Sequence, residues 1–140
     1  MAGYFFEDLS VGQSSSFGKT ITEADIAMFA AVSGDTNPVH IDAEYAAGTM
    51  FKGRIAHGML SAGLISAVLG TQLPGPGTVY LGQTLKFRAP VKLGDTVKAT
   101  VTVASLDAEK KRAVLTTVCT GGGKPVIEGE ATVMVPSRPA

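Results

Sequence analysis

The stretch GMLSAGLISAVL, residues 58–69, decides the fold of this chain. Every residue in it is apolar or small, apart from two serines, and it contains no proline. A helix that is hydrophobic on every face is buried on every face. We therefore expect a helix over 58–69 that lies inside the protein, with the rest of the chain wrapped around it.

The segment that follows this helix supplies strands. The run PGPG at 74–77 ends the helix. Strand-like runs then alternate with turn residues, over 79–88, 96–106, 112–120 and 126–135, and 14–20 could add a short strand at the front. Helices followed by antiparallel strands indicate an α+β domain. A curved antiparallel sheet wrapped around a long buried central helix is the hot-dog fold, and we expect one such domain over 1–140.

A shorter helix is expected before the central one. Thr22 is a good N-cap, and Asp25 three residues later completes a capping-box pattern. The helix should end near Gly34, because turn residues crowd 35–38. A short helical turn over 42–47 should follow. The apolar positions of the first helix are Ile26, Phe29, Ala30 and Val32.

Composition and charge narrow the class of protein. Twelve basic and twelve acidic residues balance within 140 residues, which argues against nucleic acid or an anionic membrane as the main partner. The N-terminus lacks the basic start and apolar stretch of a signal peptide, and the most apolar segment is too short and interrupted to cross a bilayer. We expect a cytoplasmic protein, with the single cysteine, Cys119, as an inert strand residue.

The segment 35–40, DTNPVH, holds the best candidates for chemistry. Asp35 and His40 can meet only if the chain turns back between them, and Asn37-Pro38 is a turn-forming dipeptide. A carboxylate and an imidazole brought together in this way could hold one water. The same residues also fit a structural role, with Asp35 capping a turn, Asn37 closing an Asx turn and His40 partly buried. Two ligands without a third nearby do not make a metal site, so no metal is expected.

A family resemblance favours the catalytic interpretation. SGDTNPVH at 33–40, followed by Ala46, resembles the hydratase-2 signature of the (R)-specific enoyl-CoA hydratases and the MaoC-like dehydratase family. GRIAHGML at 53–60 and YLGQTLKFRAPV at 80–91 agree with it in order and spacing. The short chain is most similar to the bacterial hydratases that supply monomers for polyhydroxyalkanoate synthesis.

This resemblance implies a role for each site residue. Asp35 and His40 would be the acid–base pair, with Asn37 organising the turn between them and Ser66 near the pair. Which of the pair is the base stays open, although we favour Asp35. The N–H of Gly58 would donate to the thioester oxygen. That role makes independent sense, because the first N–H groups of a helix lack internal partners and carry partial positive charge.

The implied activity is hydration of a trans-2-enoyl-CoA to the (R)-3-hydroxyacyl-CoA by a homodimer. No cofactor is expected, since coenzyme A is part of the substrate. The alternatives are a dehydratase for acyl-carrier-protein thioesters or enoyl diacids, a thioesterase, and a non-catalytic thioester-binding module. His57 is expected to be structural or capping. Four cations could meet coenzyme A phosphates but are more simply solvated: Lys52, Arg54, Lys86 and Arg88.

Overall fold

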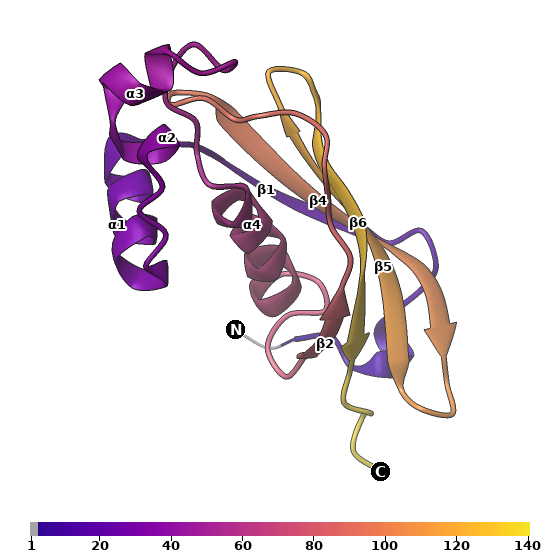
Figure 1. Ribbon diagram of the computed structural model, residues 1–140. Coiled ribbons are helices and arrows are strands. Elements are labelled where there is room, and N and C mark those ends of the chain that lie inside the picture. The colour runs from indigo at the N-terminus through magenta and orange to yellow at the C-terminus, as the bar shows by residue number, and fades with distance from the viewer. Residues whose placement is uncertain (1–2) are drawn as a thin grey trace.

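Helix α4, Gly58–Thr71, lies against the inner face of a curved antiparallel sheet in the computed structural model, which describes residues 3–140 (Figure 1). The helix contacts β4 (Thr96–Asp107), β1 (Ser14–Thr20) and β5 (Arg112–Gly121). The side chains of Ile65, Val68 and Leu69 are buried in the resulting core. The helix expected over 58–69 is therefore confirmed and is two residues longer.

One face of α4 lies outside this core. Met59, Gly63, Ser66 and Gly70 are exposed, and their spacing of three or four residues places them in one stripe along the helix. The expectation that α4 is buried on every face is wrong for this stripe. The reason is that the sheet covers only one side of the helix, so the apolar sequence alone overestimates its burial.

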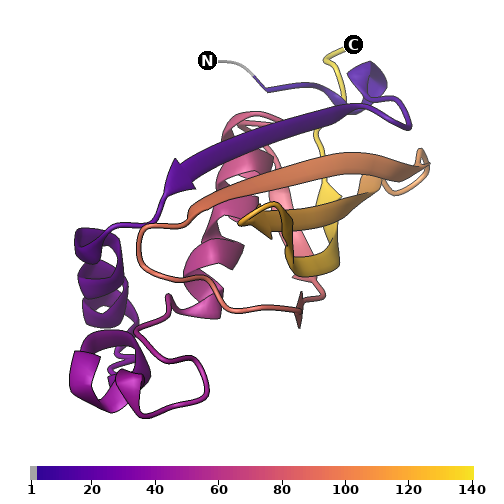
Figure 2. The ribbon, with the colours of Figure 1, turned by 90° about the horizontal axis from the view of Figure 1, so that it is seen from above.

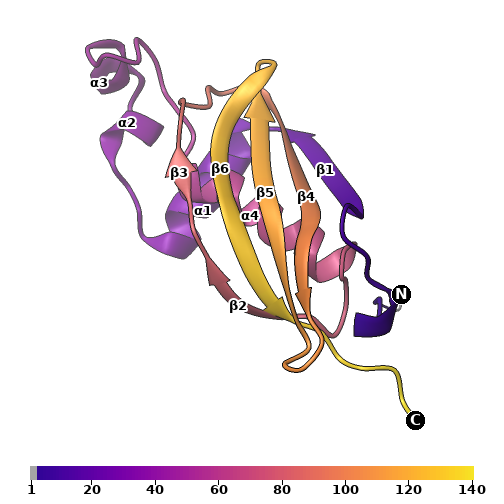
Figure 3. The same cartoon turned by 90° about the vertical axis from the view of Figure 1, so that its right-hand side faces the viewer.

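The sheet has six strands, and all its pairs are antiparallel. The order is β1-β4-β5-β6-β2, with β3 (Lys86–Phe87) paired to β6 (Lys124–Met134), so that β1 lies at one edge and β2 (Val79–Gln83) at the other (Figure 3). Alternate residues of β4 are buried against α4, as expected for a sheet with one face on the core. The α+β arrangement of the hot-dog fold is confirmed, with a sheet that stays open.

The run expected as one strand over 79–88 is divided into β2 and β3. The chain bends at Thr84, whose N–H donates to the carbonyl of Glu130 while its hydroxyl accepts from the Glu130 N–H. At this crossing a Cβ on Gly129 would lie only 1.8 Å from the Thr84 oxygen. The two backbones meet too closely for a regular ladder, so pairing resumes only at Lys86.

The remaining helices gather at one end of the molecule, beside the start of α4 (Figures 1 and 2). They are α1 (Glu23–Ser33), α2 (Pro38–Ile41) and α3 (Ala43–Ala47), and a 3-10 turn at Phe6–Asp8 lies elsewhere near the N-terminus. The capping box of Thr22 and Asp25 is confirmed. Of the apolar positions of α1, Ile26 and Ala30 are buried, whereas Val32 is 84% exposed. α2 was not anticipated, and it begins at Pro38 because proline fits the first position of a helix.

Two further expectations concern Cys119 and membrane-spanning helices. Cys119 is confirmed as a buried strand residue: it lies in β5 with no exposed surface, and burial raises the pKa of its thiol to about 11, which disfavours the reactive thiolate. Among residues 3–140, no helix is long and apolar enough to cross a membrane.

Candidate active site

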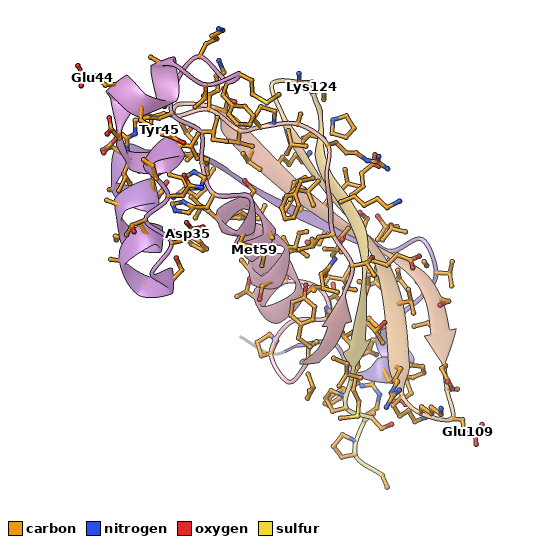
Figure 4. The ribbon with its side chains drawn as sticks, viewed as in Figure 1. Asp35, Glu44, Tyr45, Met59, Glu109 and Lys124 are labelled. Atoms are coloured by element: carbon orange, nitrogen blue, oxygen red, sulfur yellow. The ribbon has the colours of Figure 1, made fainter. Side chains whose placement is uncertain are left out.

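A cavity of about 580 Å³ opens between the helical end of the molecule and the start of α4. Asp35 lies in the loop after α1, beside the first turn of α4 that carries Met59 (Figure 4). Three parts of the chain form the walls: the turn after α1, the segment that leads into α4, and the end of β3 with the loop that follows. The lining residues are Asp35, His40, Met50, Phe51, Ile55, Ala56, His57, Gly58, Met59, Phe87, Arg88, Ala89 and Pro90.

The turn from Asp35 to His40 is built from local hydrogen bonds. The Asn37 N–H donates to Asp35 Oδ1 at 3.2 Å, and Asn37 Oδ1 in turn accepts from the Val39 N–H at 3.1 Å. The Ser33 hydroxyl accepts from the Asp35 N–H at 3.1 Å. The chain therefore turns back between Asp35 and His40 as predicted. The structural roles considered for Asp35 and Asn37 are also present in these bonds.

His40 is held in one orientation. The side chain is 8% exposed, and its Nδ1 lies 2.8 Å from the carbonyl oxygen of Ile55. A carbonyl can only accept, so Nδ1 carries the proton of this bond. The other ring nitrogen, Nε2, is consequently the one available to a water or a substrate.

The segment 54–57 hydrogen-bonds to the main chain of the turn between Asp35 and His40. The Arg54 Nε donates to the carbonyl of His40 at 2.6 Å, and its guanidinium forms two bonds with the Glu23 carboxylate, at 2.6 and 3.1 Å. The Ile55 N–H donates to the carbonyl of Val39 at 3.3 Å. Arg54 is therefore committed to the protein and not to a coenzyme A phosphate.

The other three cations considered for coenzyme A are exposed. Arg88 lines the cavity and pairs with Glu128 at 3.1 Å, whereas Lys52 and Lys86 are absent from the cavity wall. Arg88 is thus the cation that remains beside the cavity.

His57 is part of this cluster. It is 2% exposed, its Nε2 lies 2.9 Å from the carbonyl oxygen of Asp35, and its ring stacks on His40 with centroids 3.9 Å apart. His57 occupies the N-cap position of α4, but its side chain makes no capping hydrogen bond there. Sequence reasoning did not place His57 with Asp35 and His40. The available signal was that both histidines of the sequence fall within the two segments 33–40 and 53–60.

Gly58 begins α4 and faces the cavity with its backbone. Among residues 3–140, its N–H has no hydrogen-bond acceptor. A Cβ built on Gly58 would lie 2.5 Å from the ring of Phe87, closer than real side chains approach one another. The position therefore leaves no room for a side chain beside an N–H that is free to donate.

The sequence profile of the MaoC like domain matches residues 9–123. The chain belongs to the MaoC-like family. The chain is 64% identical to the (R)-specific enoyl-CoA hydratase of Rhodospirillum rubrum, in an alignment that covers 96% of this chain and 94% of that protein. It is 52% identical to the 3-hydroxybutyryl-CoA dehydratase of Methylorubrum extorquens, in an alignment that covers 96% of this chain and 85% of that protein. The solved (R)-hydratase of Aeromonas caviae, involved in PHA biosynthesis, matches with a TM-score of 0.91 and 47% identity, covering 93% of this chain and 99% of that one.

The MaoC-like site brings together most, but not all, of the residues expected in it. Asp35, His40 and Gly58 line one cavity, and Asn37, which does not line it, donates its N–H to the Asp35 carboxylate. Ser66 is exposed on α4 and is absent from the cavity wall. Ser66 does not pack between the helix and the sheet either, because it lies in the exposed stripe of α4.

The MaoC-like cluster does contain a third group of the kind that binds metals. One ligand atom each from Asp35, His40 and His57 lies within 4.8 Å of the others, so the expectation that no third ligand lies nearby is wrong. Ligands of a tetrahedral zinc at about 2.0–2.1 Å are roughly 3.4 Å apart. Two of the four imidazole nitrogens are also bonded to carbonyls. The cluster would have to contract around an ion.

Proposed function

We propose that this chain is an (R)-specific enoyl-CoA hydratase, which adds water to a trans-2-enoyl-CoA and gives the (R)-3-hydroxyacyl-CoA reversibly. The observation that carries the proposal is the meeting of the Asp35 carboxylate, the His40 imidazole and the Gly58 N–H around one cavity. The activities named for the relatives from Rhodospirillum rubrum and Methylorubrum extorquens support it.

The carboxylate and the imidazole supply the proton transfers. A water held between Asp35 and His40 Nε2 loses a proton to one of them as its oxygen forms a bond to C3 of the substrate. The π electrons move toward the thioester, and a proton returns to C2 from the same face. The His40 Nδ1–H bond to Ile55 leaves Nε2 free for this exchange. Coupled groups share such a proton, so either one can be the base.

The start of α4 stabilises the developing charge. As C3 is attacked, negative charge gathers on the thioester oxygen, and the Gly58 N–H is placed to donate to it. α4 is 14 residues long, and the partial positive charge at its first turn acts in the same direction. Donors of this kind cost no reorganisation during the reaction, because they are fixed before the substrate arrives.

A homodimer in the cytoplasm completes the proposal. The edge strand β2 exposes Val79, Tyr80 and Leu81, and the stripe of α4 described above is also uncovered. An edge strand with unpaired backbone groups is a template for another strand. A second copy paired at β2 would extend the sheet. Size-exclusion chromatography with light scattering tests this: the parent should elute as a dimer, and Leu81→Lys should shift it toward the monomer.

Crotonyl-CoA and longer enoyl-CoAs test the activity itself. Loss of the enoyl thioester absorbance, with an (R) product and no free thiol, is the expected result. Steady release of coenzyme A would establish a thioesterase, and absence of turnover would establish a binding module. Faster turnover of acyl-carrier-protein thioesters or enoyl diacids would move the assignment to those dehydratases.

The site residues are tested in the same assay. Asp35→Asn and His40→Gln should each lower kcat by about 10²- to 10⁴-fold, the usual contribution of an acid–base group. Asp42→Asn is a matched control, because Asp42 lies in the same helical end but caps α3 through the Tyr45 N–H, and asparagine caps equally well. If folded Asp35→Asn keeps more than about a tenth of the parental rate, the assigned chemistry is wrong.

A further inference from the structure

We infer that His57 is a positioning residue that fixes Asp35 and His40 relative to the Gly58 N–H. The inference rests on the proposed function, and it gives a role to a side chain for which neither the sequence nor the mechanism above has a use. His57 lines the same cavity as the three residues that it would position.

Three contacts join His57 to all parts of the site. Its Nε2 donates to the main-chain carbonyl of Asp35 at 2.9 Å, which holds the backbone that carries the carboxylate. Its ring lies on that of His40, with centroids 3.9 Å apart and planes tilted by 27°. Its own backbone is the N-cap of α4, so it is covalently joined to Gly58. One side chain therefore links the acid–base pair to the proposed oxyanion donor.

The hydrogen-bond pattern shows that packing alone does not explain a histidine here. His57 is 2% exposed, and its Nδ1 is buried without a partner among residues 3–140. A buried polar atom without a partner is unfavourable. An apolar ring of similar size would fill the space without that cost. It could also pack against Phe29, whose ring centroid lies 4.8 Å from that of His57. What only the imidazole provides is the N–H donated to Asp35.

The same pattern argues against direct proton transfer by His57. Its Nε2 is occupied by a carbonyl, and its Nδ1 has no access to the cavity solvent. The two rings thus differ in role: His40 presents a free Nε2 to the cavity, whereas His57 uses Nε2 to hold the backbone. Loss of the His57 bond should let the carboxylate drift, and a displacement of about 1 Å costs about 10²-fold in rate.

Two substitutions separate the hydrogen bond from the stacking. His57→Phe keeps a ring against His40 but lacks the donor, while His57→Gln keeps an N–H near the position of Nε2 but lacks the ring. We expect kcat for crotonyl-CoA to fall about 10²-fold in His57→Phe, with KM changed far less, and to be partly restored in His57→Gln, which regains the donor but not the stacking. Ile65→Val is the control for core loosening, since Ile65 is buried in α4 and does not line the cavity.

NMR of the imidazole nitrogens gives a readout that does not depend on activity. The sequence has two histidines, so two imidazole spin systems are expected. In the parent, His57 should carry its proton on Nε2 and His40 on Nδ1, because each of these atoms faces a carbonyl oxygen. The His40 signals should broaden or move in His57→Phe.

Each outcome decides one claim. His57→Phe with parental kcat, or His57 protonated on Nδ1 alone, would overturn the positioning role. So would equal losses in the Phe and Gln variants that follow their melting temperatures along the line set by Ile65→Val. If Asp35→Asn and His40→Gln are themselves active, the proposed function fails, whatever the NMR shows. If they are inactive while His57→Phe is normal, only the positioning role fails.

Discussion

Gly58→Pro removes the N–H at the start of α4, and the structure shows what else it would disturb. A Cβ on Gly58 would lie 2.5 Å from Cε1 and 2.7 Å from Cδ1 of Phe87, whereas carbon atoms pack at about 3.5–4.0 Å. The Phe87 ring would have to move by about 1 Å. The ring is 54% exposed, so Phe87→Ala removes the conflict at the cavity edge and provides a common background.

In that background, Gly58→Ala and Gly58→Pro differ chiefly in the N–H. Proline is tolerated at the first helical position, and His57 already has φ −59° and ψ 134°, the extended geometry that a residue before proline prefers. We expect the proline variant to be slower than the alanine variant by about 10²–10³ in kcat, equivalent to about 2.7–4 kcal/mol of transition-state stabilisation.

The assay is hydration of crotonyl-CoA by both double variants, after circular dichroism and melting have shown that α4 is intact. Comparison within one background cancels the effect of Phe87 on substrate binding. Equal kcat values in the two folded double variants would mean that the thioester oxygen is polarised by another group, and Gly58 would then matter only because it has no side chain.

Four further results are expected. Thr22→Ala should lower the free energy of unfolding by about 1 kcal/mol in urea titrations, because the N-cap bond to the Asp25 N–H is lost. The Lys19 ammonium lowers the pKa of Asp25, so this carboxylate stabilises the fold above its unfolded pKa, and Asp25→Asn should reduce the loss of stability seen as pH falls below about 4. Burial raises the pKa of Cys119 to about 11, so the unfolded chain releases this proton first; stability should decline as pH rises above about 9, and less so in Cys119→Ala. Turnover should survive dialysis against EDTA, and a loss that zinc restores would instead identify the carboxylate–imidazole cluster as a metal site.

Local signals predicted the elements well where a few neighbouring residues determine them. Thr22 and Asp25 set the start of α1, the apolar run set α4, and the glycines at 121–123 set the hairpin between β5 and β6. The bend at Thr84 depends instead on Gly129, which is more than forty residues away, so nothing within 79–88 reveals it. Exposure of the α4 stripe likewise depends on how far the sheet reaches, which composition does not determine.

The proximity of Asp35 and His40 could be predicted because the two residues are close in sequence. Asp35 and His40 meet because a proline-containing turn joins them, and the residues of that turn predict it. The place of His57 depends on the path of the chain from α3 to α4, and so does the engagement of Arg54 with the His40 carbonyl. Ser66 was expected at the site from resemblance alone, and no local pattern could show that its face of α4 points away from this cavity.

The hydrogen bonds from segment 54–57 to the turn between Asp35 and His40 have a consequence for engineering. Arg54, Ile55 and His57 all bond to main-chain carbonyls, those of His40, Val39 and Asp35. Because a carbonyl is present whatever side chain a residue carries, substitution at Val39 leaves its bond available. Variation directed at the exposed wall residues Met50 and Met59 would likewise leave these hydrogen bonds untouched. Under the proposed function, substrate preference can therefore be changed by mutation more freely than the positions of Asp35 and His40.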